Sequence, residues 1–293
     1  MEVVATYGLI LLSIVMFGGS FALKNVYRAK IGSSFKKSLQ FSLVSGIPGL
    51  IALFLTNGFV FEFTWFTFVM ALIKATSGIC LAFCGFRALG MINLSLYSLF
   101  MMLGGMVLPY LQGIVFYGEP MTFAKGICFA LICVSLLLTI DKKRGKTTKG
   151  GGVYYAVIFI LNGMSGVLSK YFTEAKFEKT SPAGFSIMTA ITTISLSAFL
   201  LLFFIGKGDK MRQTPLTLTI AASNGILNKL ANYIQVLTLA NGVQASVQYS
   251  MVTGGVIMMS TLISCFGKKK PTVKVLISAA IAFIAIFALL IPF

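Results

Sequence analysis

The sequence contains no histidine, and only seven of its 293 residues are acidic. The acidic residues all fall at or near the ends of apolar runs: Glu2, Glu62, Glu119, Asp141, Glu174, Glu178 and Asp209. Acid–base and metal chemistry in a membrane would need such groups within the runs, so we expect no enzyme activity, no metal and no cofactor. The five cysteines are odd in number and lack the spacing of a disulfide framework or a zinc site. No Gly-x-x-x-x-Gly-Lys-Ser/Thr signature occurs, so we do not expect ATP to drive the protein.

Charged residues of either sign are also scarce, at 11%, whereas 57% of the residues are hydrophobic and the mean hydropathy is +0.94. A soluble domain of this length would need a far more polar surface. Because backbone groups in lipid must bond internally, apolar runs of about 20 residues indicate membrane-spanning helices. We therefore predict an all-α, multi-pass protein of the cell membrane whose main surroundings are the lipid bilayer.

The net charge of +17 does not indicate a nucleic-acid partner, because the basic residues lie in short loops between apolar runs. Eighteen of the 24 lysines and arginines fall in the odd-numbered loops, and only four fall on the other side. Basic loops are typically retained in the cytoplasm. This bias predicts that both termini lie outside.

Ten spans are predicted, at about 4–23, 38–56, 65–88, 91–116, 121–140, 153–172, 183–205, 215–240, 243–266 and 272–292. A basic loop divides them equally, which predicts a first five-helix repeat (1–140), a linker loop (141–152) and a second five-helix repeat (153–293). An odd number of spans per repeat makes the two halves run antiparallel, as in many secondary transporters.

Short matches between the two halves keep the same order, at an offset of about 150 residues. Gly18-Gly19-Ser20 with Lys24 parallels Gly163-Met-Ser-Gly166 with Lys170, Tyr97-Ser98 parallels Tyr249-Ser250, and Gly104-Gly105 parallels Gly254-Gly255. Their common order favours an internal repeat.

The eighth span carries a stripe of amides that hydrocarbon would not tolerate. Asn224, Asn228, Asn232 and Gln235 fall within about 80° on a helical wheel, with Lys229 at the edge. Each unpaired polar group in hydrocarbon costs several kcal/mol, so the stripe must face protein or a water-filled cavity. We interpret it as one wall of a solute pathway.

Lys74 and Lys229 lie near the middle of the third and eighth spans, which correspond in the two repeats. Snorkelling or structural pairing would be the ordinary explanation, but no acidic residue in the spans is available as a partner. A substrate carboxylate or phosphate would satisfy both lysines. A neutral lysine that couples transport to protons is an alternative.

Further polar residues lie in the fourth, sixth and ninth spans. The candidates for substrate contacts are Tyr97, Asn162, Gln244, Gln248 and Tyr249. Hydrogen bonds between helices are the alternative explanation for these amides.

Ordered motifs give the chain a resemblance to the EamA-type members of the drug/metabolite transporter superfamily. Those motifs are Phe17-Gly18-Gly19-Ser20-Phe21-Ala22-Leu23-Lys24, Ala88-Leu89-Gly90, Pro109 and Gly118-Glu119. The resemblance implies a ten-helix fold around a central cavity, used by a metabolite exporter or exchanger. It also implies that helices 1, 3, 4, 6, 8 and 9 line the cavity and that helices 5 and 10 are peripheral. The sequence departs from the family at Gly267-Lys268-Lys269 and in a ninth span that contains no proline. Its charge bias also places both termini outside, whereas the family usually has them inside.

The leading hypothesis is a secondary transporter of a small anionic or zwitterionic metabolite, with the lysines meeting the anionic group. An exporter of lipophilic cationic drugs is an alternative, but it would need a carboxylate within the membrane. A non-transporting receptor or scaffold is the third class. The sequence leaves homodimerisation open.

Overall fold

The computed structural model describes residues 2–32, 34–88, 94–139, 152–204, 213–266 and 271–290, which form ten α-helices. They are α1 (Glu2–Ile31), α2 (Phe35–Thr56), α3 (Trp65–Ala88), α4 (Leu94–Tyr117), α5 (Phe123–Leu138), α6 (Gly152–Glu174), α7 (Pro182–Phe204), α8 (Pro215–Ala240), α9 (Ala245–Cys265) and α10 (Val273–Leu290). The predicted all-α class and the ten helices are confirmed, and all boundaries but one agree within three residues. The exception is the end of α1, so that Lys24, assigned to a loop from the sequence, lies inside a helix.

Within the described ranges, seven helices are long and apolar enough to cross a membrane, which indicates an integral, multi-pass membrane protein. They are α1, α2, α3, α4, α6, α7 and α9, whereas α5 and α10 are apolar but shorter. The long helix α8 falls outside this set because its asparagines and Lys229 lower its mean hydropathy. The prediction that all ten helices span the membrane therefore stays a prediction for these three.

Several helices begin at residues whose side chains satisfy free backbone N–H groups. Ser34 accepts a hydrogen bond from the Lys37 N–H at the start of α2. Thr214 and Thr217 form a reciprocal capping box before α8, whose first residue is Pro215. Such caps stabilise helix starts because the first four N–H groups have no partner within the helix.

Glycines allow the helices around the interior to approach closely. A Cβ atom at Gly225 of α8 would collide with the Ser45 carbonyl oxygen of α2, and one at Gly104 of α4 would collide with the Phe159 backbone of α6. Small residues at such contacts let backbones pack directly against each other in membranes.

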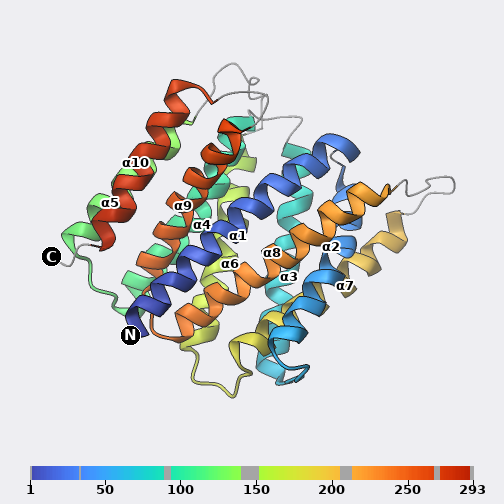
Figure 1. The fold of residues 1–293 in the computed structure, drawn as a ribbon. Helices are drawn as coiled ribbons and strands as arrows, with labels where there is room; N and C mark the ends of the chain where they lie inside the picture. Colours follow the sequence, from blue (N-terminus) through green and yellow to red (C-terminus); the bar gives the residue numbers. More distant parts are fainter. Residues whose placement is uncertain are drawn as a thin grey trace.

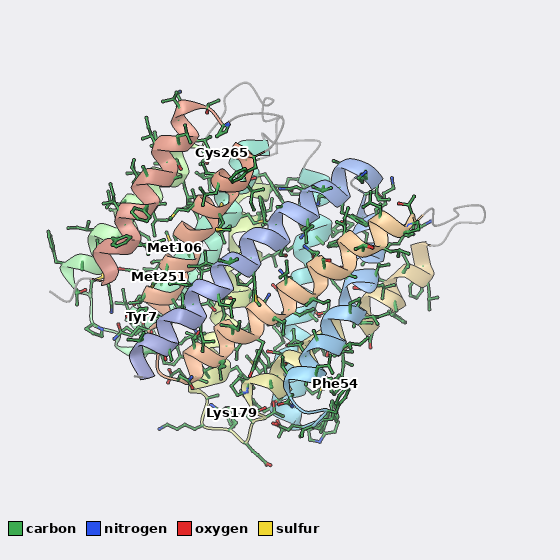
Figure 2. The ribbon with its side chains drawn as sticks, viewed as in Figure 1. Tyr7, Phe54, Met106, Lys179, Met251 and Cys265 are labelled. Atoms are coloured by element: carbon green, nitrogen blue, oxygen red, sulfur yellow. The ribbon has the colours of Figure 1, made fainter. Side chains whose placement is uncertain are left out.

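The helices alternate in direction, so that the loops at 57–64, 118–122, 175–181 and 241–244 lie at one end of the bundle, called here the terminal side because the chain starts there (Figure 1). The opposite end, called the basic side, includes the end of α1 and the start of α2. Helix α8 packs on α1 and α2, helix α6 packs on α4 and α3, and α5 pairs with α10 at one edge (Figure 1). Met106 and Met251 are fully buried between helices (Figure 2).

Parts of the predicted landmarks lie outside the described residues. These are residues 141–151 of the basic linker loop, Leu89 and Gly90 of the motif Ala88-Leu89-Gly90, and the segment Gly267-Lys268-Lys269.

Candidate functional site

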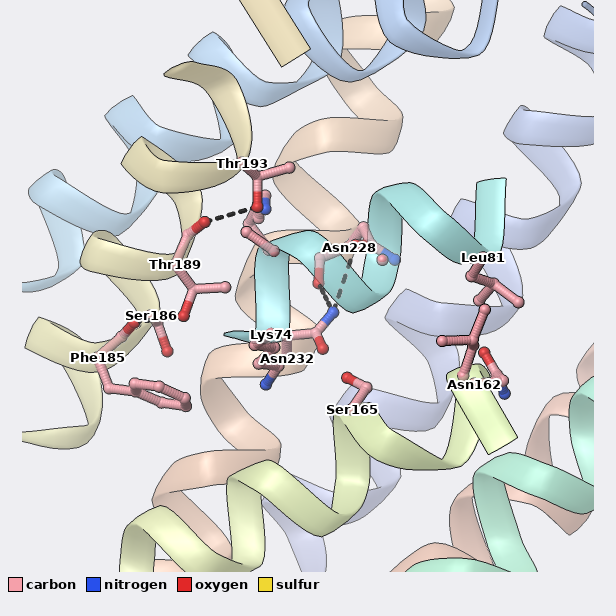
Figure 3. Close-up of a pocket in the computed structure, with 14 residues that line it drawn as sticks. Lys74, Leu81, Asn162, Ser165, Phe185, Ser186, Thr189, Thr193, Asn228 and Asn232 are labelled. Carbon is pink, nitrogen blue, oxygen red and sulfur yellow. Dashed lines mark hydrogen bonds between the residues drawn. The ribbon is translucent and has the colours of Figure 1, made fainter. Parts of the chain in front are cut away.

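A cavity of about 260 Å³, called here the Lys74 cavity, lies between α3, α6, α7 and α8. It is lined by Lys74, Ala75, Gly78, Leu81, Leu161, Asn162, Ser165, Phe185, Ser186, Thr189, Thr193, Asn228, Lys229 and Asn232. Figure 3 shows Lys74, Asn228 and Asn232 on one side of this space and Thr189 on a facing helix. Apart from the two lysines, all the lining residues are uncharged, and seven of these twelve are polar.

A second cavity of about 200 Å³, called here the Lys24 cavity, adjoins the first. Its polar lining consists of Ser20, Lys24, Ser38, Ser42, Ser45, Thr193, Asn224, Asn228 and Lys229. The two cavities share Gly78, Thr193, Asn228 and Lys229, so they meet at the middle of α8. Lys24 and Ser38 lie near the basic-side ends of their helices, and this cavity therefore extends from the shared residues toward the basic side.

Lys74 is held by neutral partners. Its Nζ donates a hydrogen bond of 2.6 Å to the Ser169 hydroxyl and lies 5.1 Å from the ring centre of Phe185. Phe185 stacks on Phe172 with ring centres 4.0 Å apart, near the terminal-side ends of α6 and α7. Among the described residues, no carboxylate contacts this lysine, and neutral groups orient it.

Lys229 has no hydrogen bond or ion pair within the described part of the chain. On the same helix, Asn232 donates to the backbone carbonyl of Asn228 at 2.8 Å and to its side-chain oxygen at 3.3 Å. Asn224 is buried and donates to the carbonyl and hydroxyl of Ser20 in α1 at 2.6 and 2.9 Å. The amide stripe therefore faces protein and the two cavities rather than lipid.

A carboxylate connects the two halves of the chain at the terminal side. Glu119, in the loop before α5, accepts hydrogen bonds from the Ala245 N–H at 2.7 Å and from the N–H and hydroxyl of Ser246 at 2.9 and 2.6 Å. Lys170 lies 3.2 Å from the same carboxylate and 2.8 Å from Glu174. Burial alone would raise the pKa of Glu119, but the hydrogen bonds from Ser246 and Ala245, with the charge of Lys170, hold it below its ordinary value.

A second carboxylate makes a similar connection at the start of α7. Glu62, in the loop before α3, accepts hydrogen bonds from the Ser181 N–H and from its hydroxyl, the latter at 2.7 Å. Helix N-termini favour negative charge, since their free N–H groups point outward. Two carboxylates of the first half thus hold two helix starts of the second half.

The structure brings six predicted site residues to the cavities and places five elsewhere. Those at the cavities are Lys74, Asn162, Asn224, Asn228, Lys229 and Asn232. The other five are Tyr97, Gln235, Gln244, Gln248 and Tyr249, none of which is among the lining residues.

Hydrogen bonds and packing account for the positions of four of these five. Gln248 is fully buried, accepts from Thr238 at 2.8 Å and donates to the Gln235 carbonyl at 2.9 Å. Gln244 accepts from Lys125 at the terminal side. Tyr249 donates to the Gly166 carbonyl at 3.3 Å, and Tyr97 packs beside Ile158 in a buried cluster.

The sequence interpretation missed Lys24 and the polar face of α7. Ser186, Thr189 and Thr193 recur at helical spacing, a periodic signal that could have identified this wall. The resemblance implied that helices 4 and 9 line the cavity, but the described cavities are lined by α2 and α7 in addition to α1, α3, α6 and α8. Helices α4 and α9 pack against each other and against α6 and α1 instead, while α5 and α10 contribute to neither cavity.

No protein-family model matches the chain, and no curated protein matches it. A solved structure described only as "Crystal structure of protein" is similar, with a TM-score of 0.76 and 18% sequence identity. The alignment covers 96% of this chain and 94% of that chain. The likeness shows that the two chains share a ten-helix fold over nearly their full lengths.

Proposed function

We propose that the chain is a secondary transporter, an exporter or exchanger of a small anionic or zwitterionic metabolite. The observation that carries the proposal is that Lys74 and Lys229, from two different helices, line one interior cavity whose other lining residues are neutral. A cation in the interior of a membrane protein without a carboxylate partner is costly, and a bound anion would remove that cost. Amide and hydroxyl groups around it would orient the solute.

Alternating access between two inverted five-helix repeats is the mechanism we propose. The helix contacts support it, because they come in pairs related by a shift of five helices. Contacts of α1 with α8 and α9 are matched by contacts of α6 with α3 and α4, and α2 on α8 is matched by α7 on α3. The resemblance to EamA-type transporters supports the same arrangement. Rocking one half against the other would expose the cavities to each side in turn.

The cationic-drug alternative receives less support. Such an exporter needs a carboxylate where cation and proton compete, and none is among the residues that line the two described cavities. A receptor or scaffold would predict that the two lysines have no effect on solute flux.

Thermal stabilisation of the purified protein tests the proposal. A ligand that binds only the native state raises the melting temperature by mass action. The panel should contain amino acids, organic acids, phosphate esters, sugars and lipophilic cations, with wild type beside Lys74→Ala/Lys229→Ala. Lys176→Ala, on an exposed loop, is the control. We expect an anion or zwitterion to stabilise wild type and the control but not the double variant.

Flux into proteoliposomes then separates transport from mere binding. We expect the stabilising anion to exchange across the membrane in wild type and not in the double variant. A preference for cations or neutral sugars, or an undiminished response of the double variant, would contradict the proposal.

A further inference from the structure

We propose that the transported solute is a small dianion that occupies both cavities, with one anionic group beside Lys229 and Lys74 and the other beside Lys24. This inference rests on the proposed transport function and adds the charge and shape of the solute. Suitable chemistry is a dicarboxylate on a short carbon skeleton.

The first argument is the number of uncompensated cations. Lys24, Lys74 and Lys229 come from α1, α3 and α8, and no carboxylate lines either cavity in the described ranges. Lys24 and Lys229 have no hydrogen bond or ion pair among the described residues. A monoanion would leave most of this positive charge unbalanced, which is unfavourable in a membrane interior.

The second argument is how these cations are distributed. Lys74 lines only its own cavity, Lys24 lines only the other, and Lys229 lines both. The positive charge is therefore spread along two adjoining spaces instead of being concentrated at one point. A solute with two separated anionic groups matches this distribution, whereas a single carboxylate or phosphate would meet only one end of it.

The third argument is the neutral lining between the lysines. Thr193 and Asn228 belong to both cavities. The side-chain oxygen of Asn228 accepts from Asn232, and its amide N–H₂ has no acceptor within the described part of the chain. A free donor between the two cationic ends is available to an oxygen atom of either anionic group.

Lys24 also lies where an anion would arrive from the basic side. Arg28 follows it by one helical turn in α1. Positive charge at the mouth of a site raises the local concentration of anions. Lys24 is thus suited to receive the second anionic group while the first lies deeper.

The test compares dianions with matched monoanions. The probes are malonate, succinate and glutarate, each beside its monomethyl ester, at neutral pH. Thermal shift and calorimetric titration are recorded for wild type, Lys24→Met, Lys24→Arg and the control Lys30→Met, which changes an exposed lysine on the same helix.

We expect at least one dianion to bind wild type about tenfold or more tightly than its ester. Lys24→Met should abolish that preference while retaining ester binding, whereas Lys24→Arg and Lys30→Met should keep it. Equal binding of dianion and ester to wild type, unchanged in Lys24→Met, would overturn the dianion inference and leave the proposed function intact. If only neutral or cationic solutes, or no anion, stabilised wild type, both would be overturned.

Discussion

The carboxylate of Glu119 caps helix α9 from another part of the chain, because it accepts hydrogen bonds from both the backbone N–H and the hydroxyl of Ser246. Helix α9 needs this partner, because Gln244, the residue before its first turn, makes no capping hydrogen bond with its side chain. The same carboxylate pairs with Lys170 of α6. One acidic residue therefore joins the loop before α5 to two helices of the second half.

The first prediction is that Glu119→Gln destabilises the protein by about 2–3 kcal/mol. The glutamine amide would keep the shape of the glutamate side chain but weaken the charge-assisted hydrogen bonds. Lys170 would lose the ion pair with Glu119 and keep the one with Glu174. Melting in detergent, followed by circular dichroism, measures the loss. Glu178→Gln, on the exposed loop 175–181, is the control and should melt like wild type. Equal melting of both variants would contradict the assigned role.

The second prediction concerns pH. The pKa of Glu119 is lowered in the folded protein, so its stabilising contribution is fully present above the ordinary value of 4.5. That contribution is lost as the pH falls below 4.5 and through the lowered folded-state pKa, because the folded carboxylate then takes up a proton. We expect wild type to lose more melting temperature than Glu119→Gln over this acidic range. Parallel curves for the two proteins would show that another group is responsible.

The third prediction concerns the closest helix contacts. Gly225→Ala and Gly104→Ala should each destabilise by at least about 2–3 kcal/mol, because the added methyl group would meet backbone atoms that cannot rotate away. Gly8→Ala is the control, since nothing lies within 4 Å of the added Cβ and alanine favours a helix. Yield and melting temperature in detergent give the comparison. A well-folded Gly225→Ala would mean that α2 and α8 do not pack as described.

The helices could be predicted from the sequence because the length of each apolar run determines where a membrane helix begins and ends. The end of α1 could not, since Lys24 and Arg28 resemble the first residues of a cytoplasmic loop although the helix continues to Ile31. Basic side chains are tolerated near helix ends, where they reach polar surroundings. Charge alone therefore does not mark where a membrane helix stops.

The candidate site could be predicted only where polar residues repeat along one helix. The helical spacing of the asparagines in α8 was enough to group Asn224, Asn228 and Asn232, and the fold places all three at the two cavities. Thr189 and Thr193 were not distinguished, because threonines in spans bond to their own helix, as both do here. Which polar face meets a cavity and which meets another helix depends on tertiary packing, and a single sequence does not contain it.

The fourth prediction separates these two kinds of polar residue. Gln248 is fully buried and makes hydrogen bonds to Thr238 and the Gln235 carbonyl, so Gln248→Met should destabilise by about 1–3 kcal/mol. Because Gln248 lines neither described cavity, we expect anion affinity to change by less than about tenfold. Asn232→Leu should do the reverse, because Asn232 lines the Lys74 cavity and its hydrogen bonds are confined to its own helix.

Calorimetric titration with the anion that stabilises wild type, beside melting of each variant, measures both quantities. We expect Asn232→Leu to weaken binding by about tenfold at nearly unchanged melting temperature. The opposite pattern would be binding that is lost in Gln248→Met and retained in Asn232→Leu. It would show that the anion binds at the contact between α8 and α9 and not in the Lys74 cavity. Two substitutions of similar size on neighbouring helices would then have distinguished a cavity wall from a packing interface.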